Sequence, residues 1–143
     1  MSAIQVANSL RPGSGEPALT AARAAAPEGK VVATDLSEEM MAFAATRAEE
    51  LGLSNVEFRM MDANEPDVET EAFDAVLSRW GLMFLAQLDN TLAGIHRCLK
   101  PGGRLVAVVW GPPDGAPTNS LADRVIRKKL GLPPPNEGPL TPF

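Results

Sequence analysis

The stretch that most constrains the fold of this chain is KVVATDLSEE, from Lys30 to Glu39. Small and β-branched residues lead directly into Asp35, and a serine and two glutamates then begin a stretch rich in alanine and methionine. This pattern predicts a buried parallel strand with a carboxylate at its carboxyl end, followed by a helix. Ligands of open α/β sheets bind at that edge, where a carboxylate can accept hydrogen bonds from both hydroxyls of a ribose. We therefore expect Asp35 to bind a nucleotide.

The composition is that of one acidic domain. With 143 residues, of which 45% are hydrophobic, the chain can form one core but not two. The net charge of -5 argues against a nucleic-acid partner, because phosphate binding needs a concentrated basic face. A single cysteine predicts no internal disulfide. Met1 to Leu10 lacks a signal-peptide pattern, and no apolar stretch approaches the ~20 residues of a membrane span. These features predict a cytoplasmic protein without a membrane span.

Strand and helix patterns alternate along the chain. Strands are expected at Ile4–Ala7, Lys30–Asp35, Val56–Met61, Phe73–Ser78 and Leu105–Trp110. Helices are expected at Pro17–Ala26, from the N-cap Ser37 to the stop at Gly52, around the apolar stripe Leu88, Leu92, Ile95 and Leu99, and at Ser120–Leu130. A turn is expected at Pro101 to Gly103. This alternation predicts an α/β fold with a doubly wound, mainly parallel, Rossmann-like sheet of about five strands.

Two motifs supply candidate binding groups at the carboxyl edge of this sheet. GSGEPA, from Gly13 to Ala18, fits the pattern G-x-G-x-x-A, and Asp35 follows Gly15 by 20 residues. Such a turn lets a ligand approach the backbone at a helix N-terminus. Asp62 and Ala63 follow the third strand, where a carboxylate can accept from an adenine amino group while the next backbone N–H donates to a ring nitrogen. Acids at the ends of two adjacent strands predict an adenosine site.

Four motifs in this order resemble those of the class I S-adenosylmethionine-dependent methyltransferases, and within them the ubiquinone and menaquinone biosynthesis C-methyltransferases. They are VVATDLS, MDA, FDAVLSRWGLMF and LKPGGRL, and the resemblance runs from about Gly13 to Trp110. It implies the strand order 3-2-1-4-5, the cofactor S-adenosyl-L-methionine and in-line methyl transfer to a small-molecule acceptor. By the same resemblance, Gly13 and Gly15 would face the methionine part of the cofactor, and Ser78 would lie beside the methionyl group. Asp35 would bind the ribose. Leu36 and Met40 would lie against the adenine ring, and Asp62 and Ala63 would bind the edge of the adenine. It assigns no catalytic residue and no metal.

The chain also departs from the family pattern. Ser9 stands where the family has an acidic residue, four positions before the first loop glycine. The family continues into a further helix and an antiparallel strand pair, and it commonly begins with a helical segment over the substrate. We therefore expect a truncated or divergent cofactor-binding domain at residues 1–130, followed by a proline-rich tail at 131–143. The strand Leu105–Trp110 would then be an apolar sheet edge, which we expect the tail or a second subunit to cover.

Two other functions stay open at this point. A nicotinamide-dependent oxidoreductase would use the same glycine loop and Asp35, although the absence of tyrosine removes the tyrosine and lysine pair of the short-chain dehydrogenases. A non-catalytic remnant or interaction module is favoured by Ser9 and by the missing segments. Among the remaining candidates, His96 and Cys98 are expected to be structural or solvated. Trp80, Met83 and Phe84, next to Arg79, are candidates for an acceptor pocket, and the basic residues Arg124, Arg127, Lys128 and Lys129 are expected to form a solvated helix face.

Overall fold

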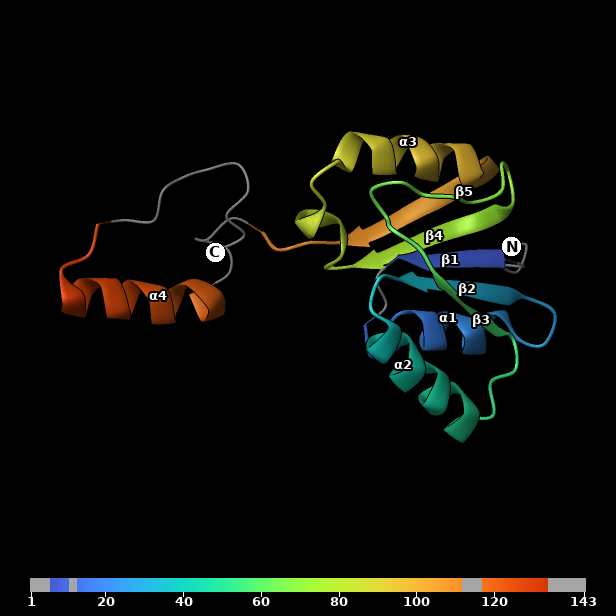
Figure 1. Cartoon of the computed structure of the whole chain (residues 1–143), viewed down its shortest axis with the longest axis horizontal. Helices are drawn as coiled ribbons and strands as arrows, with labels where there is room; N and C mark the ends of the chain where they lie inside the picture. Colours follow the sequence, from blue (N-terminus) through green and yellow to red (C-terminus); the bar gives the residue numbers. More distant parts are fainter. Residues whose placement is uncertain (1–5, 11–12, 112–116, 134–143) are drawn as a thin grey trace. The chain divides into compact units, whose positions relative to one another are not determined.

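The computed structural model describes residues 6–10, 13–111 and 117–133, in two compact units, Met1–Val108 and Val109–Phe143 (Figure 1). The first unit contains β1 (Val6–Leu10), α1 (Ala18–Ala25), β2 (Lys30–Asp35), α2 (Glu38–Glu50), β3 (Val56–Met60), β4 (Phe73–Arg79), the short 3-10 helix η1 (Leu82–Phe84), α3 (Leu88–Cys98) and β5 (Leu99–Val108). The second contains α4 (Pro117–Leu130). Of the tail predicted at 131–143, residues 134–143 lie outside the described part of the chain. Within the described ranges, no helix is long and apolar enough to cross a membrane.

The five strands form one sheet in the order β3-β2-β1-β4-β5, and all four strand pairings are parallel (Figure 1). Helices α1 and α2 lie on one side of this sheet and α3 on the other. Parallel strands need such crossovers because a tight turn cannot return the chain to the start of the next strand. The predicted Rossmann-like α/β class is confirmed.

The first strand differs from its prediction. It was expected at Ile4–Ala7, but the structure places it at Val6–Leu10, and Ile4 lies outside the described residues. Asn8 and Ser9 continue the strand, paired with Val32 and Ala33 of β2 on one side and with β4 on the other. Backbone pairing on both sides of a central strand outweighs the weak strand propensity of these polar residues.

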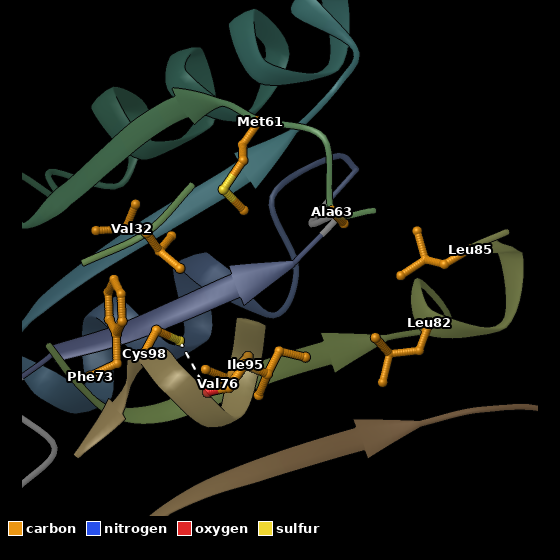
Figure 2. Packing of buried hydrophobic residues seen from close by; sticks show 10 residues of the cluster. Val32, Met61, Ala63, Phe73, Val76, Leu82, Leu85, Ile95 and Cys98 are labelled. Carbon is orange, nitrogen blue, oxygen red and sulfur yellow. Dashed lines mark hydrogen bonds between the residues drawn. The ribbon is translucent and has the colours of Figure 1, made fainter. Parts of the chain in front are cut away.

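Two hydrophobic clusters fill the two faces of the sheet, and alternate strand residues supply them. Val31 and Ala33 pack with Ala18 and Ala22 of α1, whereas Val32 packs in the other cluster. In that second cluster, side chains of β2, β4 and α3 converge (Figure 2). Its members are Val32, Met61, Ala63, Val68, Phe73, Val76, Leu82, Leu85, Ile95 and Cys98. The period of two along a strand therefore divides β2 between both layers of the core.

The helix α3 is rotated relative to its prediction. Leu88 and Leu92 were expected in the buried stripe with Ile95 and Leu99, but both are exposed. The residues that α3 buries are Thr91, Gly94, Ile95 and Cys98. Thr91 faces inward because its hydroxyl finds a backbone acceptor in the preceding loop, and Gly94 because a proline ring packs against it. Polar and steric complementarity with that loop thus outweighs leucine burial.

The last strand also differs from the sequence prediction, because β5 begins at Leu99 and not at Leu105. Pro101, Gly102 and Gly103 do not turn the chain out of the sheet but form an irregularity in it, since Phe73 pairs with Leu99 and Ala75 with Arg104. Beyond this bulge, β5 is exposed, including its large apolar residues Leu105, Val106 and Val108.

Candidate functional site

The carboxyl ends of β1 to β4 lie at one level of the sheet and carry the predicted site residues. Asp35 is in register with Met60 of β3, and the Met61 amide continues this pairing by donating to the Asp35 carbonyl at 3.1 Å. Leu10 is in register with Thr34 of β2 and with Ser78 of β4. Chain segments that are far apart in sequence therefore meet at the edge where ligands of α/β sheets bind.

Asp35 joins the two loops that flank this edge. Its side chain is almost buried, with 8% of the residue surface exposed. Oδ2 accepts from the backbone N–H of Gly13 at 3.3 Å, and Oδ1 accepts from that of Ser37 at 3.1 Å. Each carboxylate oxygen can accept more than one hydrogen bond, so both keep capacity for a ligand hydroxyl. The carboxylate is thus held by the protein and remains able to bind a diol.

The glycine loop has the conformation that its glycines allow. Gly13 and Gly15 have φ values of 55° and 109°. A Cβ at Gly15 would lie 2.7 Å from Cδ1 of Leu19 on α1, and one at Gly13 would lie 3.5 Å from Cε of Met40. The absence of side chains therefore allows the loop to lie close to both helices.

Helix α2 holds the same loop from outside. The Arg47 guanidinium donates to the Ser14 carbonyl and lies 3.8 Å from the Glu16 carboxylate. Glu16 in turn accepts from the hydroxyl of Thr20 on α1 at 2.7 Å. The loop is therefore fixed at Gly13 by the end of β2 and at Ser14 and Glu16 by α2.

Two apolar side chains stand exposed at the start of α2. Ser37 caps this helix, as predicted, by accepting from the Met40 amide at 3.3 Å. Leu36 is 58% exposed and Met40 39% exposed, although both are large and apolar. The Met40 side chain also borders the glycine loop, because a Cβ at Gly13 would lie 3.5 Å from Cε of Met40. These two side chains present an apolar surface beside Asp35, of the kind that the flat face of a base requires.

Asp62 and Ala63 follow β3 and are held by a hydrogen-bonded loop. Oδ1 of Asp62 accepts from both the backbone N–H and the side-chain amide of Asn64, at 2.8 and 2.9 Å. Asn64 Oδ1 accepts from the backbone N–H of Gln87 at 3.0 Å, and this hydrogen bond connects the loop to the segment before α3. Among the described residues, no hydrogen bond is found at Oδ2 of Asp62. The Ala63 methyl is buried in the core, so only its backbone can contact a ligand (Figure 2).

Ser78 occupies the opposite end of the site. It is 3% exposed, and its hydroxyl has no hydrogen-bond partner within the described part of the chain. Strand β1 separates it from Asp35, and three strand spacings separate β3 from β4, about 14 Å in all. The eight predicted residues therefore do not surround one point. They follow an elongated line along the edge of the sheet.

Arg79, Trp80 and Phe84 lie beyond Ser78 at the same edge. The Arg79 guanidinium lies 5.0 Å from the centre of the Trp80 ring, and both side chains are exposed. Trp80 has a φ of 60°, a strained value for an aromatic residue, and its backbone N–H donates to the Val108 carbonyl at 2.7 Å. Phe84 of η1 is also exposed. An aromatic surface thus borders the Ser78 end of the site.

His96 and Cys98 have the environments that the sequence suggested. His96 is exposed on α3. Cys98 is buried, and its Sγ donates to the Ile95 carbonyl at 3.3 Å. Burial raises the pKa of the Cys98 thiol, so it stays protonated and is a poor nucleophile near neutral pH.

Sequence reasoning missed three residues that hold the site in place, namely Arg47, Asn64 and Thr91. Thr91 is fully buried and donates to the Ala63 carbonyl at 2.6 Å. Asn64 could have been found, because an aspartate two residues before an asparagine often forms a local side-chain to backbone turn. Arg47 and Thr91 act across 33 and 28 residues of sequence, and no local pattern indicates either contact.

Comparisons with known proteins identify the family. A family model described as a methyltransferase domain matches residues 10–107, more than half of the chain. The ubiquinone/menaquinone biosynthesis C-methyltransferase of Pseudomonas entomophila is 32% identical over 113 residues, which cover 78% of this chain and 43% of that protein. The demethylmenaquinone methyltransferase of Thermus thermophilus is 39% identical over 88 residues, 62% of this chain and 40% of that protein. The chain thus spans less than half the length of these relatives.

Solved structures show the same fold. An S-adenosylmethionine-dependent methyltransferase from Aquifex aeolicus superposes with a TM-score of 0.70 over 89% of this chain and 71% of that one, at 23% identity. The cyclase SpnF superposes with a TM-score of 0.65 over 71% of this chain and 37% of that one, at 33% identity. The chain belongs to the class I S-adenosylmethionine-dependent methyltransferases, and among them it is similar to the ubiquinone and menaquinone biosynthesis C-methyltransferases.

Proposed function

We propose that this chain binds S-adenosylmethionine along the carboxyl ends of β1 to β4 and transfers its methyl group to a small-molecule acceptor. The observation that carries the proposal is the junction at Asp35, where one carboxylate holds both the glycine loop and the start of α2. The adenine would lie at Asp62 and Ala63, between Leu36 and Met40. The ribose would bind Asp35, and the methionyl part would extend past Gly13 and Gly15 toward Ser78.

Two features of the site fit this cofactor. Among the residues that the structure describes, the buried Ser78 hydroxyl has no partner, and an unpaired buried hydroxyl is costly unless a ligand supplies its hydrogen bond. The glycine loop leads into α1, whose N-cap residue Pro17 makes no side-chain capping hydrogen bond, so a ligand carboxylate would lie near the positive end of this helix. The side chain of Ser9, the departure from the family pattern, lies outside the described part of the structure.

The chemistry needs little from the protein beyond position. When bound, the sulfonium of the cofactor supplies both the methyl group and a good leaving group, a neutral thioether. Transfer to the acceptor would release this thioether and pass the proton of the acceptor to solvent or to a base. Asp35 and the glycine loop would hold the cofactor in place, and the aromatic side chains of Trp80 and Phe84 would limit access of water on the acceptor side.

The acceptor class follows from the relatives and not from the fold. The names of the related proteins place them in quinone biosynthesis, so demethylated quinones are the first acceptors to test. The structural similarity to a cyclase means that this fold does not by itself fix the reaction. Methyl transfer is therefore the part of the proposal that needs a direct assay.

Calorimetric titration of the whole chain separates the open functions. We expect S-adenosylhomocysteine, the product, to bind and NAD not to bind. Binding of NAD alone would favour an oxidoreductase, and binding of no nucleotide would favour a non-catalytic remnant. Transfer of a labelled methyl group from S-adenosylmethionine to a demethylated quinone, followed by mass spectrometry, then tests the reaction itself.

A further inference from the structure

Helix α3 holds the loop that follows β3, and Thr91 is the centre of this contact. The Thr91 side chain is fully buried, and its hydroxyl lies 2.6 Å from the Ala63 carbonyl oxygen and 3.2 Å from the Gln87 carbonyl oxygen. A hydroxyl has one proton, which goes to the nearer and better acceptor. The hydrogen bond to Ala63 therefore dominates, and it links α3 to a loop 28 residues earlier in the chain.

The next turn of α3 holds the same loop by shape. A Cβ at Gly94 would lie 2.1 Å from Cγ of Pro66, so the proline ring occupies the space that any other residue would fill. One turn further, the Arg97 guanidinium donates to the Pro66 carbonyl at 3.0 Å. Three residues of one helix face therefore fix the backbone between Ala63 and Pro66.

We infer that Thr91 is a positioning residue for adenine recognition, an inference that rests on the proposed cofactor site. The Ala63 side chain points into the core, so the contribution of Ala63 to an adenine site is its backbone N–H. The Thr91 hydroxyl fixes the peptide group between Ala63 and Asn64, which adjoins the peptide group that carries the Ala63 N–H. The carbonyl of that second peptide group, at Asp62, accepts from the backbone N–H of Glu65 at 3.1 Å. Thr91 therefore limits rotation of the backbone at Ala63, while Asn64 fixes the Asp62 carboxylate beside it.

A second threonine provides a matched control. Thr46 on α2 also donates from its hydroxyl to the carbonyl four residues earlier, Ala42, at 3.1 Å, but it is exposed and this hydrogen bond stays within its own helix. Replacement of Thr46 by valine removes the same kind of helix contact and leaves the hydrogen bond to Ala63 in place. Thr46→Val therefore controls for the loss of a helical threonine hydroxyl.

The test is a comparison of two ligands, S-adenosylhomocysteine and S-inosylhomocysteine. The inosine base has a carbonyl at position 6 and a proton on N1, so its acceptor would face the Asp62 carboxylate and its donor would face the Ala63 N–H, the reverse of adenine. We expect Thr91→Val to weaken binding of the adenine ligand by roughly 5- to 10-fold and that of the inosine ligand by less than about 2-fold. Thr91→Ser, which keeps the hydroxyl, should restore most of the selectivity, and Thr46→Val should not change it.

A stability defect alone would weaken the binding of both ligands equally. An unchanged ratio of the two affinities in Thr91→Val would therefore overturn the inference, while the proposed function would stand. If Thr91→Val fails to fold, Gly94→Ala is the deciding variant. The added Cβ displaces the Pro66 ring but leaves the Thr91 hydroxyl in place, and alanine favours the helix. Gly94→Ala is expected to lower the same ratio. Absence of binding to the unmodified chain would reject the proposed function and this inference together.

Discussion

The Gly13 amide donates to the Asp35 carboxylate at 3.3 Å, across 22 residues of sequence, and this hydrogen bond joins the glycine loop to the end of β2. The second oxygen of Asp35 accepts from Ser37. One side chain thus sets the distance between the two walls of the proposed cofactor site. This dual role means that a change at Asp35 acts on both stability and binding.

Asp35→Ala is expected to lower the free energy of unfolding by about 1–3 kcal/mol, because two part-buried backbone donors lose their acceptor. Its affinity for S-adenosylhomocysteine should fall by about 10- to 100-fold, the usual effect of losing a charged acceptor. Asp35→Asn, which keeps one acceptor oxygen, should be more stable than Asp35→Ala and still bind weakly. Urea unfolding and calorimetry measure the two effects, with the exposed Asp67→Ala as control. Undiminished affinity in both variants would place the ribose elsewhere.

Gly15→Ala tests whether the glycine loop depends on close packing. A Cβ at Gly15 would lie 2.7 Å from Leu19 at a φ of 109°, whereas one at Gly52, with a φ of 66°, would have no atom of the described residues within 4 Å. Gly52→Ala should cost about 1 kcal/mol from the backbone alone. Gly15→Ala should cost about 1–3 kcal/mol more, from overpacking against α1, and should weaken cofactor binding. Equal unfolding free energies in urea would mean that the loop relaxes freely around the added methyl group.

Arg47→Ala tests the contact between α2 and the glycine loop. Arg47 donates to the Ser14 carbonyl and lies near Glu16, whereas Arg23 on α1 is exposed and serves as the matched control. We expect Arg47→Ala to lower the unfolding free energy by about 0.5–1.5 kcal/mol, mainly from the lost hydrogen bond, since the partly exposed ion pair is screened. Binding of S-adenosylhomocysteine should weaken by about 5-fold for the same reason. If Arg23→Ala has the same two effects, Arg47 has no special role in holding the loop.

Sequence reasoning predicted those parts of this molecule that depend on local pattern. β2 has the predicted bounds because its run of small and β-branched residues is buried on both faces of a parallel sheet. Ser37 caps α2 as predicted because a cap is a contact over three residues. The position of Asp35 at the end of β2 and the glycine turn before α1 were predicted for the same reason, since each is a local signal at a strand end, and their role in binding stays a prediction.

The parts that were missed depend on contacts between distant segments. Asn8 and Ser9 have little strand propensity, and only their two neighbouring strands make them part of the sheet. The buried face of α3 was placed wrongly because Leu92 is more apolar than Thr91, whereas the Ala63 carbonyl and the Pro66 ring select Thr91 and Gly94. Periodicity reports hydrophobicity alone, so it cannot show a face chosen by a hydrogen bond and by shape.

The buried thiol of Cys98 predicts a loss of stability at alkaline pH. Burial raises its pKa in the folded chain above the value of about 8.5 that is usual for an exposed cysteine. Below that pH, both the folded and the unfolded chain keep the proton, so the stabilisation is complete. As the pH rises, the unfolded chain ionises first, and the unfolding free energy falls by up to about 1.4 kcal/mol per pH unit until the folded thiol also ionises.

Cys98→Ala should lack this component of the pH dependence, at the cost of a constant loss of packing. Urea unfolding of both forms across this pH range measures the difference, and thiolate absorbance can be followed without a contribution from tyrosinate because the chain contains no tyrosine. Parallel curves for the two proteins would show that Cys98 ionises equally in the folded and unfolded states and that its burial does not control its protonation.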